Sequence, residues 1–196
     1  MSVPDADQPA GGIRPFPRLD KLHERHFGLT PSICGALAEA AAVCLNRHHR
    51  PPIRAAVTGA DVPDAEYRLD WPIPTPREQG ASANTIDATE AGAYCLALGA
   101  AEMHLNLLAV CRAEVETGAD YYIGPPGAVL DTETGELDLE QAFRLEVSGM
   151  DHYDLESDFA RRLAAKVDQA RRGRSNVPAV ASVVAFRPCH IGFRVV

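Results

Sequence analysis

Three acidic side chains between residues 90 and 146 have the residue type and the spacing to bind a divalent cation. Glu90 lies in an alanine-rich segment with a helical pattern, Asp120 begins the strand-like stretch DYYIG, and Glu146 lies near the end of the strand-like stretch QAFRLEVSG. Antiparallel pairing would make Asp120 and Glu146 neighbours. Clustered carboxylates repel each other without a cation, and Mg²⁺ or Mn²⁺ prefers such all-oxygen sites. The pattern therefore predicts a metal site able to activate water for attack on a phosphodiester bond.

Each of these acids also has an ordinary structural interpretation. Glu90 fits a helix-capping or solvated residue, Asp120 fits a turn, and Glu146 fits the solvent face of a half-buried strand. We favour the metal site because three acids converge in one order along the chain.

Basic side chains gather in the segment RRLAAKVDQARRGR near the end of the chain. This cluster, with Arg161 and Arg162 at its start, fits either a solvated helix face or an edge that follows the phosphates of a substrate. Arg144 precedes Glu146 by two residues, so both should point to the same face of the strand. There Arg144 would contact the substrate or form an ion pair.

Two helices are expected in the first half of the chain. The first runs from Pro31 to His49, with Thr30 as N-cap and two prolines as its stop. The second starts after Asp87 as N-cap, which puts Glu90 at the third helical position. Its small residues permit close packing against a sheet.

The second half alternates strands with one helix. Strands are expected in LLAVCRAEVE, DYYIG, QAFRLEVSG and VPAVASVVAF, and the helix spans Leu155 to Arg172. Residues 190–196 could add an edge strand. The order of helix, three strands, helix and strand predicts an α/β fold with an antiparallel meander.

In this order of elements and acids the chain resembles the PD-(D/E)xK nuclease-like superfamily. The matching pieces are Glu90 in DATEAGAY, Asp120 in TGADYYIG, Glu146 in RLEVSG, and Lys166 with Gln169 in RLAAKVDQ. The resemblance implies an αβββαβ restriction-endonuclease-like core, a central mixed sheet flanked by helices, with an additional N-terminal helical segment. It also implies Mg²⁺ or Mn²⁺ held by the three acids, and cleavage of nucleic acid, with DNA favoured.

Ser148 departs from the pattern of this superfamily, which usually has a lysine two residues after the strand glutamate. Some branches supply the lysine from the following helix, and Lys166 stands on that helix with Gln169 one turn onward. By this resemblance Lys166 would orient the attacking water or stabilise the transition state, and Gln169 would contact a phosphate or water. The side chains expected to face the substrate are Arg144, Ser148, Arg161 and Arg162.

Composition indicates a folded protein of ordinary globular type. The chain has 196 residues, of which 46% are hydrophobic and 23% charged, and a formal net charge of -8. Such a charge disfavours a stand-alone nonspecific nucleic-acid binder. The five cysteines are scattered and odd in number, so we expect buried reduced thiols in a cytoplasmic protein. No apolar stretch approaches the length that spans a bilayer, so no membrane association is expected.

The organisation expected from the sequence is a flexible tail (1–17), a helical or irregular extension packed on the core (18–86), and the nuclease-like core (87–196). Within the extension, Pro51 to Asn84 would form short strands or an irregular wrap around the core. The alanine- and leucine-rich first helix needs a packing partner, which would be the core or a second copy in a homodimer. Partner subunits would supply specificity. The competing hypothesis, favoured by Ser148, is a catalytically inactive nuclease-fold protein that acts as a binding or assembly subunit.

Overall fold

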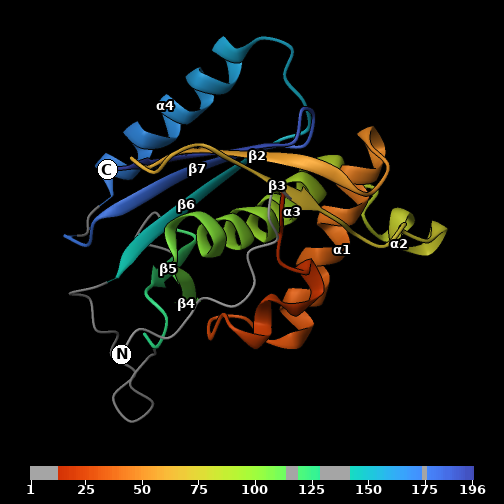
Figure 1. The fold of residues 1–196 in the computed structure, drawn as a ribbon, viewed down its shortest axis with the longest axis horizontal. Helices are drawn as coiled ribbons and strands as arrows, with labels where there is room; N and C mark the ends of the chain where they lie inside the picture. Colours follow the sequence, from red (N-terminus) through yellow and green to blue (C-terminus); the bar gives the residue numbers. More distant parts are fainter. Residues whose placement is uncertain (1–12, 114–118, 129–141, 174–175) are drawn as a thin grey trace.

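The protein has an α/β fold built on one mixed sheet. A computed structural model describes residues 13–113, 119–128, 142–173 and 176–196. Within these residues eight strands form a sheet of order β1-β3-β2-β8-β7-β6-β5-β4 (Figure 1). The strands are β1 (Arg14–Pro15), β2 (Ile53–Gly59), β3 (Ala65–Leu69), β4 (Leu108–Arg112), β5 (Tyr121–Gly124), β6 (Phe143–Met150), β7 (Ala179–Ala185) and β8 (His190–Val195).

Helices cover both faces of this sheet. The α-helices are α1 (Pro31–His48), α2 (Pro76–Ala81), α3 (Thr85–Ala100) and α4 (Glu156–Arg172); a 3-10 turn, η1, spans Leu19–Glu24, and a π-helical turn, η2, continues α3 over Ala101–Leu105. Figure 1 shows α4 on one face of the sheet and α1 with α3 on the other. The main hydrophobic core lies between the sheet and the α1–α3 layer.

The second half of the chain follows the expected order of elements. In the sequence α3-β4-β5-β6-α4-β7, the first three strands pair antiparallel, and β7 returns through α4 to lie parallel to β6. This parallel return requires a crossover of the length that α4 provides. The predicted α/β fold with helices on both sides of a mixed sheet is confirmed.

Of the two expectations for Pro51 to Asn84, the structure shows the short strands. β2 and β3 form an antiparallel hairpin, and β2 pairs parallel with β8, so the region predicted as a helical or irregular extension belongs to the same sheet. Arg14–Pro15, placed in the predicted tail, pair with β3, and Phe16 is buried. The segment predicted as an edge strand, β8, is central, because the hairpin covers its outer side.

The two long helices start at side-chain caps. The Thr30 side chain accepts a hydrogen bond from the Ile33 backbone, and Pro31 is the first helical residue, as predicted. The predicted cap of α3 was wrong: Asn84 caps this helix by accepting from the Ile86 and Asp87 backbones. An asparagine three residues earlier accepts from free N–H groups at the start of the helix. Glu90 therefore lies in the second turn of α3 instead of at its third position.

α1 packs against α3 inside the chain, and eight of its residues are buried. Of the two packing partners expected from the sequence, the core or a second copy, the structure shows the core. Because its apolar face is covered there, α1 gives no support to a homodimer, which stays a prediction without this argument.

The cysteines form no disulfide in the part of the chain that the structure describes. Cys34, Cys44, Cys95 and Cys189 are buried, and Cys111 is half-buried. Burial raises the pKa of Cys44 to about 11 and that of Cys189 to about 12, so both are inert thiols. Among the described helices, none has the length and apolarity needed to cross a bilayer.

Candidate functional site

The site begins where two neighbouring strands separate. β5 pairs with β6 only over Tyr121–Ile123 and Phe143–Leu145, so β6 continues beyond Leu145 without a strand partner on that side in the described residues. The N-terminal part of α3 approaches this edge closely, since a Cβ at Gly149 would lie 2.6 Å from the Thr89 carbonyl oxygen. With α4 on the other face, these elements enclose a cleft of about 610 Å³. Its walls include Glu90, Ser148, Asp151, Arg162, Lys166 and Gln169.

Asp120 lies at the point of separation and links β5, β6 and α3. Its backbone N–H donates to the Leu145 carbonyl at 2.9 Å, and its Oδ2 accepts from the Val147 N–H at 2.8 Å. Its Oδ1 accepts from the Tyr94 hydroxyl at 2.8 Å. Two hydrogen bonds therefore hold the carboxylate and a third fixes its backbone, which keeps Asp120 near Glu146, the strand residue between Leu145 and Val147.

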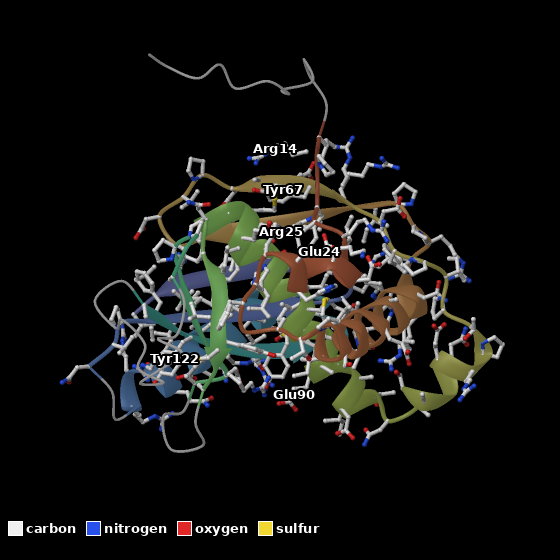
Figure 2. The ribbon with its side chains drawn as sticks, turned by 90° about the horizontal axis from the view of Figure 1, so that it is seen from below. Arg14, Glu24, Arg25, Tyr67, Glu90 and Tyr122 are labelled. Atoms are coloured by element: carbon white, nitrogen blue, oxygen red, sulfur yellow. The ribbon has the colours of Figure 1, made fainter. Side chains whose placement is uncertain are left out.

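Tyr94 connects Asp120 to Glu90. The same Tyr94 hydroxyl lies 3.0 Å from Glu90 Oε1, as expected for residues one turn apart on α3. One hydroxyl proton thus serves two carboxylates. Burial and these two neighbouring acids raise the pKa of Tyr94, which therefore stays protonated. In Figure 2 the Glu90 side chain points outward at the lower rim of the molecule, on the same side as Tyr122.

Glu146 is the most unusual carboxylate of the site. Its side chain is 0% exposed, and neither carboxylate oxygen has a hydrogen-bond partner among the described residues. The nearest cation is Lys166, whose Nζ lies 3.6 Å from Oε2. Burial raises the pKa of Glu146 by more than the Lys166 charge lowers it. A buried carboxylate with two unused oxygens is stabilised by taking up a proton or by binding a further cation.

α4 supplies the positive side of the cleft. The Lys166 side chain is 13% exposed, and its ammonium donates to Gln169 Oε1 at 3.3 Å. Arg162, one turn earlier on the same face, donates from Nε to Ser148 Oγ at 2.8 Å. Hence two cations of α4 converge on the strand positions of Glu146 and Ser148.

The other two arginines expected to face the substrate lie elsewhere. Arg144 is buried, and its guanidinium donates to the carbonyls of Val177 at 3.0 Å and Ala170 at 3.3 Å, which fastens the end of α4 to the sheet. Arg161 is exposed and pairs with Asp158 at 2.8 Å. Neither side chain lines the cleft.

No family model, no curated protein and no solved structure matches this chain. The chemistry of the cleft is therefore the basis for any functional assignment.

The carboxylate oxygens of Glu146 and Asp120, next to the cleft, suit a divalent cation in type. Glu146 offers two unpartnered carboxylate oxygens, and Asp120 is held beside it. Within the described ranges, no three His, Cys, Asp or Glu side chains gather closely enough to hold a metal ion. Glu90 instead reaches Asp120 through Tyr94. The arrangement thus fits a centre with two carboxylate ligands and a third acid linked through a hydroxyl.

Two residues of the site were missed by the sequence analysis. Tyr94 could have been found, because it follows Glu90 by four residues on one helix. Asp151 lines the cleft and accepts from Arg47 at 3.2 Å, with His48 Nε2 at 3.0 Å from its other oxygen. This contact joins α1 to the end of β6, and no local pattern predicts it.

Proposed function

We propose that this chain is a metal-dependent nuclease that hydrolyses phosphodiester bonds in nucleic acid, with DNA the first substrate to test. The observation that supports this most is Glu146, a fully buried carboxylate with both oxygens unpartnered among the described residues. It lies near Asp120 and next to Lys166, which lines the cleft. A purely structural carboxylate at such a depth would be hydrogen-bonded.

Asp120 and Glu146 would hold the Mg²⁺ or Mn²⁺, with Glu90 placed behind them through Tyr94. When bound, the ion would lower the pKa of water and neutralise charge on the scissile phosphate. Tyr94 and the Val147 N–H keep Asp120 in place. This positioning fixes the ligand geometry before substrate arrives.

Lys166 has the role that the superfamily resemblance assigns to a lysine. Its ammonium lies beside Glu146, and Gln169 holds it through a hydrogen bond. From there it can donate to a non-bridging phosphate oxygen and stabilise the charge that develops during attack. Arg162, fixed by Ser148, offers a second cation for the same backbone.

We also propose a compartment and a mode of assembly for this enzyme. The thiols form no disulfide where they are described, which agrees with a cytoplasmic protein. The acidic net charge of -8 favours a nuclease that works with partner subunits or a second copy.

The decisive experiment compares the two lysines of the chain. Lys166→Met keeps the apolar stem of this mostly buried side chain and removes the ammonium, whereas Lys21→Met removes an exposed ammonium that pairs with Glu24 at 2.9 Å. With Mn²⁺, we expect Lys166→Met to lower the cleavage rate by about 100-fold or more and Lys21→Met to leave it unchanged. Calorimetry should show that both variants still bind Mn²⁺.

Asp120→Asn tests the metal half of the proposal. It removes the charge of a ligand, so both cleavage and Mn²⁺ binding should be lost. If the wild-type protein with Mn²⁺ cuts neither single- nor double-stranded DNA or RNA, the nuclease proposal is wrong. The chain is then better described as a binding or assembly subunit with a nuclease-like fold.

A further inference from the structure

Arg112, at the end of the edge strand β4, is held over two aromatic rings. Its guanidinium carbon lies 4.6 Å from the ring centroid of Tyr94 and 4.7 Å from that of Tyr121. The residue is exposed, and within the described residues it forms no ion pair with a carboxylate. Stacking on both rings and a hydrogen bond to the Tyr121 side chain restrict the guanidinium to one place. With five N–H donors, the guanidinium can still bind a further acceptor.

The rings under Arg112 belong to the candidate site. Tyr94 is the residue whose hydroxyl contacts Glu90 and Asp120, and Tyr121 follows Asp120 directly in the chain. Both tyrosines pack in the core on the α3 side of the sheet, whereas Lys166 and Arg162 reach the site from α4 on the opposite side (Figure 1). The acids therefore lie between cations that come from the two faces of the sheet.

Other arginines near the site are already engaged. Arg144 donates to backbone carbonyls, Arg47 pairs with Asp151 at 3.2 Å, and Arg161 pairs with Asp158 at 2.8 Å. Arg112 and Arg162 differ because no carboxylate is paired with either of them among the described residues. A fixed guanidinium without an anion beside a cluster of acids suits an incoming phosphate.

We propose that Arg112 binds a backbone phosphate of the substrate strand, on the side of the acid cluster opposite to Lys166 and Arg162. This inference rests on the proposed function, since it takes a polynucleotide as the ligand. The polynucleotide strand is then bound from two sides. Lys166 and Arg162 of α4 contact the phosphate next to the acids, and Arg112 contacts a neighbouring phosphate. Arg112 thereby sets the register of the strand, because phosphate contacts position a nucleic acid without reading its sequence.

The test compares two stacked arginines. Arg14 lies 5.9 Å from the centroid of Tyr67, and Figure 2 shows this pair on the side of the molecule opposite to Glu90. Arg112→Gln and Arg14→Gln therefore remove the same charge from the same kind of contact at opposite ends of the protein. Binding of phosphorothioate 20-mers of single- and double-stranded DNA, which resist hydrolysis, is measured by fluorescence anisotropy with Mn²⁺ across a salt series.

We expect Arg112→Gln to weaken binding about tenfold and to lower the salt slope by about one, with Mn²⁺ affinity unchanged. Arg14→Gln should bind as the wild type does. Arg112→Lys, which keeps the charge without the planar fork, should fall between the two. If Arg112→Gln lowers the melting temperature, Arg112→Lys becomes the variant whose binding is compared with that of the wild type.

The outcomes separate this inference from the nuclease proposal. If the wild type cleaves and Arg112→Gln binds and cleaves equally well, the inference about Arg112 is overturned and the nuclease stands. If Arg112→Gln loses binding while no variant cleaves, Arg112 is supported and the nuclease proposal fails. If the wild type binds no nucleic acid, both fail.

Discussion

Two glutamates of this protein show how differently the fold treats a buried carboxylate. Glu102, in η2, has a side chain that is 17% exposed and accepts hydrogen bonds from Arg25 Nε at 2.5 Å, Arg25 Nη2 at 3.1 Å and His26 Nε2 at 3.0 Å. Glu146 is fully buried and has only the Lys166 ammonium, at 3.6 Å. The first carboxylate is saturated with donors and the second is not.

The pKa values of the two acids shift in opposite directions. Burial raises the pKa of Glu102, but the hydrogen bonds from His26 and Arg25 outweigh it, so the net shift is downward. For Glu146 burial outweighs the attraction of Lys166, and the pKa rises. The difference teaches that Glu102 stabilises the fold as an anion, whereas Glu146 destabilises it until another cation arrives.

The largest expected effect is stabilisation by Mn²⁺. At a free concentration 100 times its Kd, an ion that binds only the folded protein adds about 2.7 kcal/mol to the free energy of unfolding. Thermal melting of the wild type should show this increase, and Glu146→Gln should lose most of it. Glu102→Gln should keep it in full. An equal Mn²⁺ effect in both variants would show that Glu146 is no ligand.

The next largest effect is expected at Glu102. Glu102→Gln places an amide against the Arg25 and His26 donors, and we expect a loss of about 2 kcal/mol at pH 7 in urea unfolding. Because the folded pKa of Glu102 is lowered, the stabilisation is present above its ordinary value of 4.5 and disappears as the pH falls through the lowered value. The deficit of the variant should therefore shrink in acid. A deficit independent of pH would contradict this explanation.

The smallest expected effect is an increase in the free energy of unfolding, opposite in sign to the loss expected at Glu102. Without metal, Glu146→Gln should raise the free energy of unfolding by about 1 kcal/mol at pH 8, because a neutral amide replaces a poorly solvated anion. Since the folded pKa of Glu146 is raised, the wild type loses stability as the pH rises from 4.5 through the raised value. The advantage of the variant should grow over this interval and then level off. A destabilised variant at pH 8 would show that the contact with Lys166 outweighs burial.

The sequence was sufficient for the part of the fold with strong local signals. α1, α4 and the strands β4 to β7 follow from periodicity, turn residues and apolar runs, and their order predicts the mixed sheet. Arg14–Pro15 and β8 were misplaced because their environment depends on pairing with β3 and β2. A two-residue strand has no period of its own. Such long-range pairing carries no signal in a neighbouring window of sequence.

The candidate site likewise has a part that the sequence predicted and a part that it did not. Strand pairing predicted that Asp120 and Glu146 are neighbours, and the resemblance implied that Lys166 joins them. The structure brings these residues together. The hydrogen bonds of Arg144 to backbone carbonyls could not be predicted. The alternation of side chains along a strand gives the face on which Arg144 lies, but not the groups that it contacts there. Arg112 was missed because stacking on Tyr94 and Tyr121 depends on the packing of α3 against β4 and β5.

The parallel pairing of β2 with β8 has a consequence for how the protein folds. Ala56 lies opposite His190, so this single ladder joins the β2–β3 hairpin to the strands that carry the acids. Contacts so distant in sequence form late, because a long loop must close first. The β4-to-β7 half can assemble its meander from nearer segments, and we expect the hairpin to dock afterwards and cover the free edge of β8.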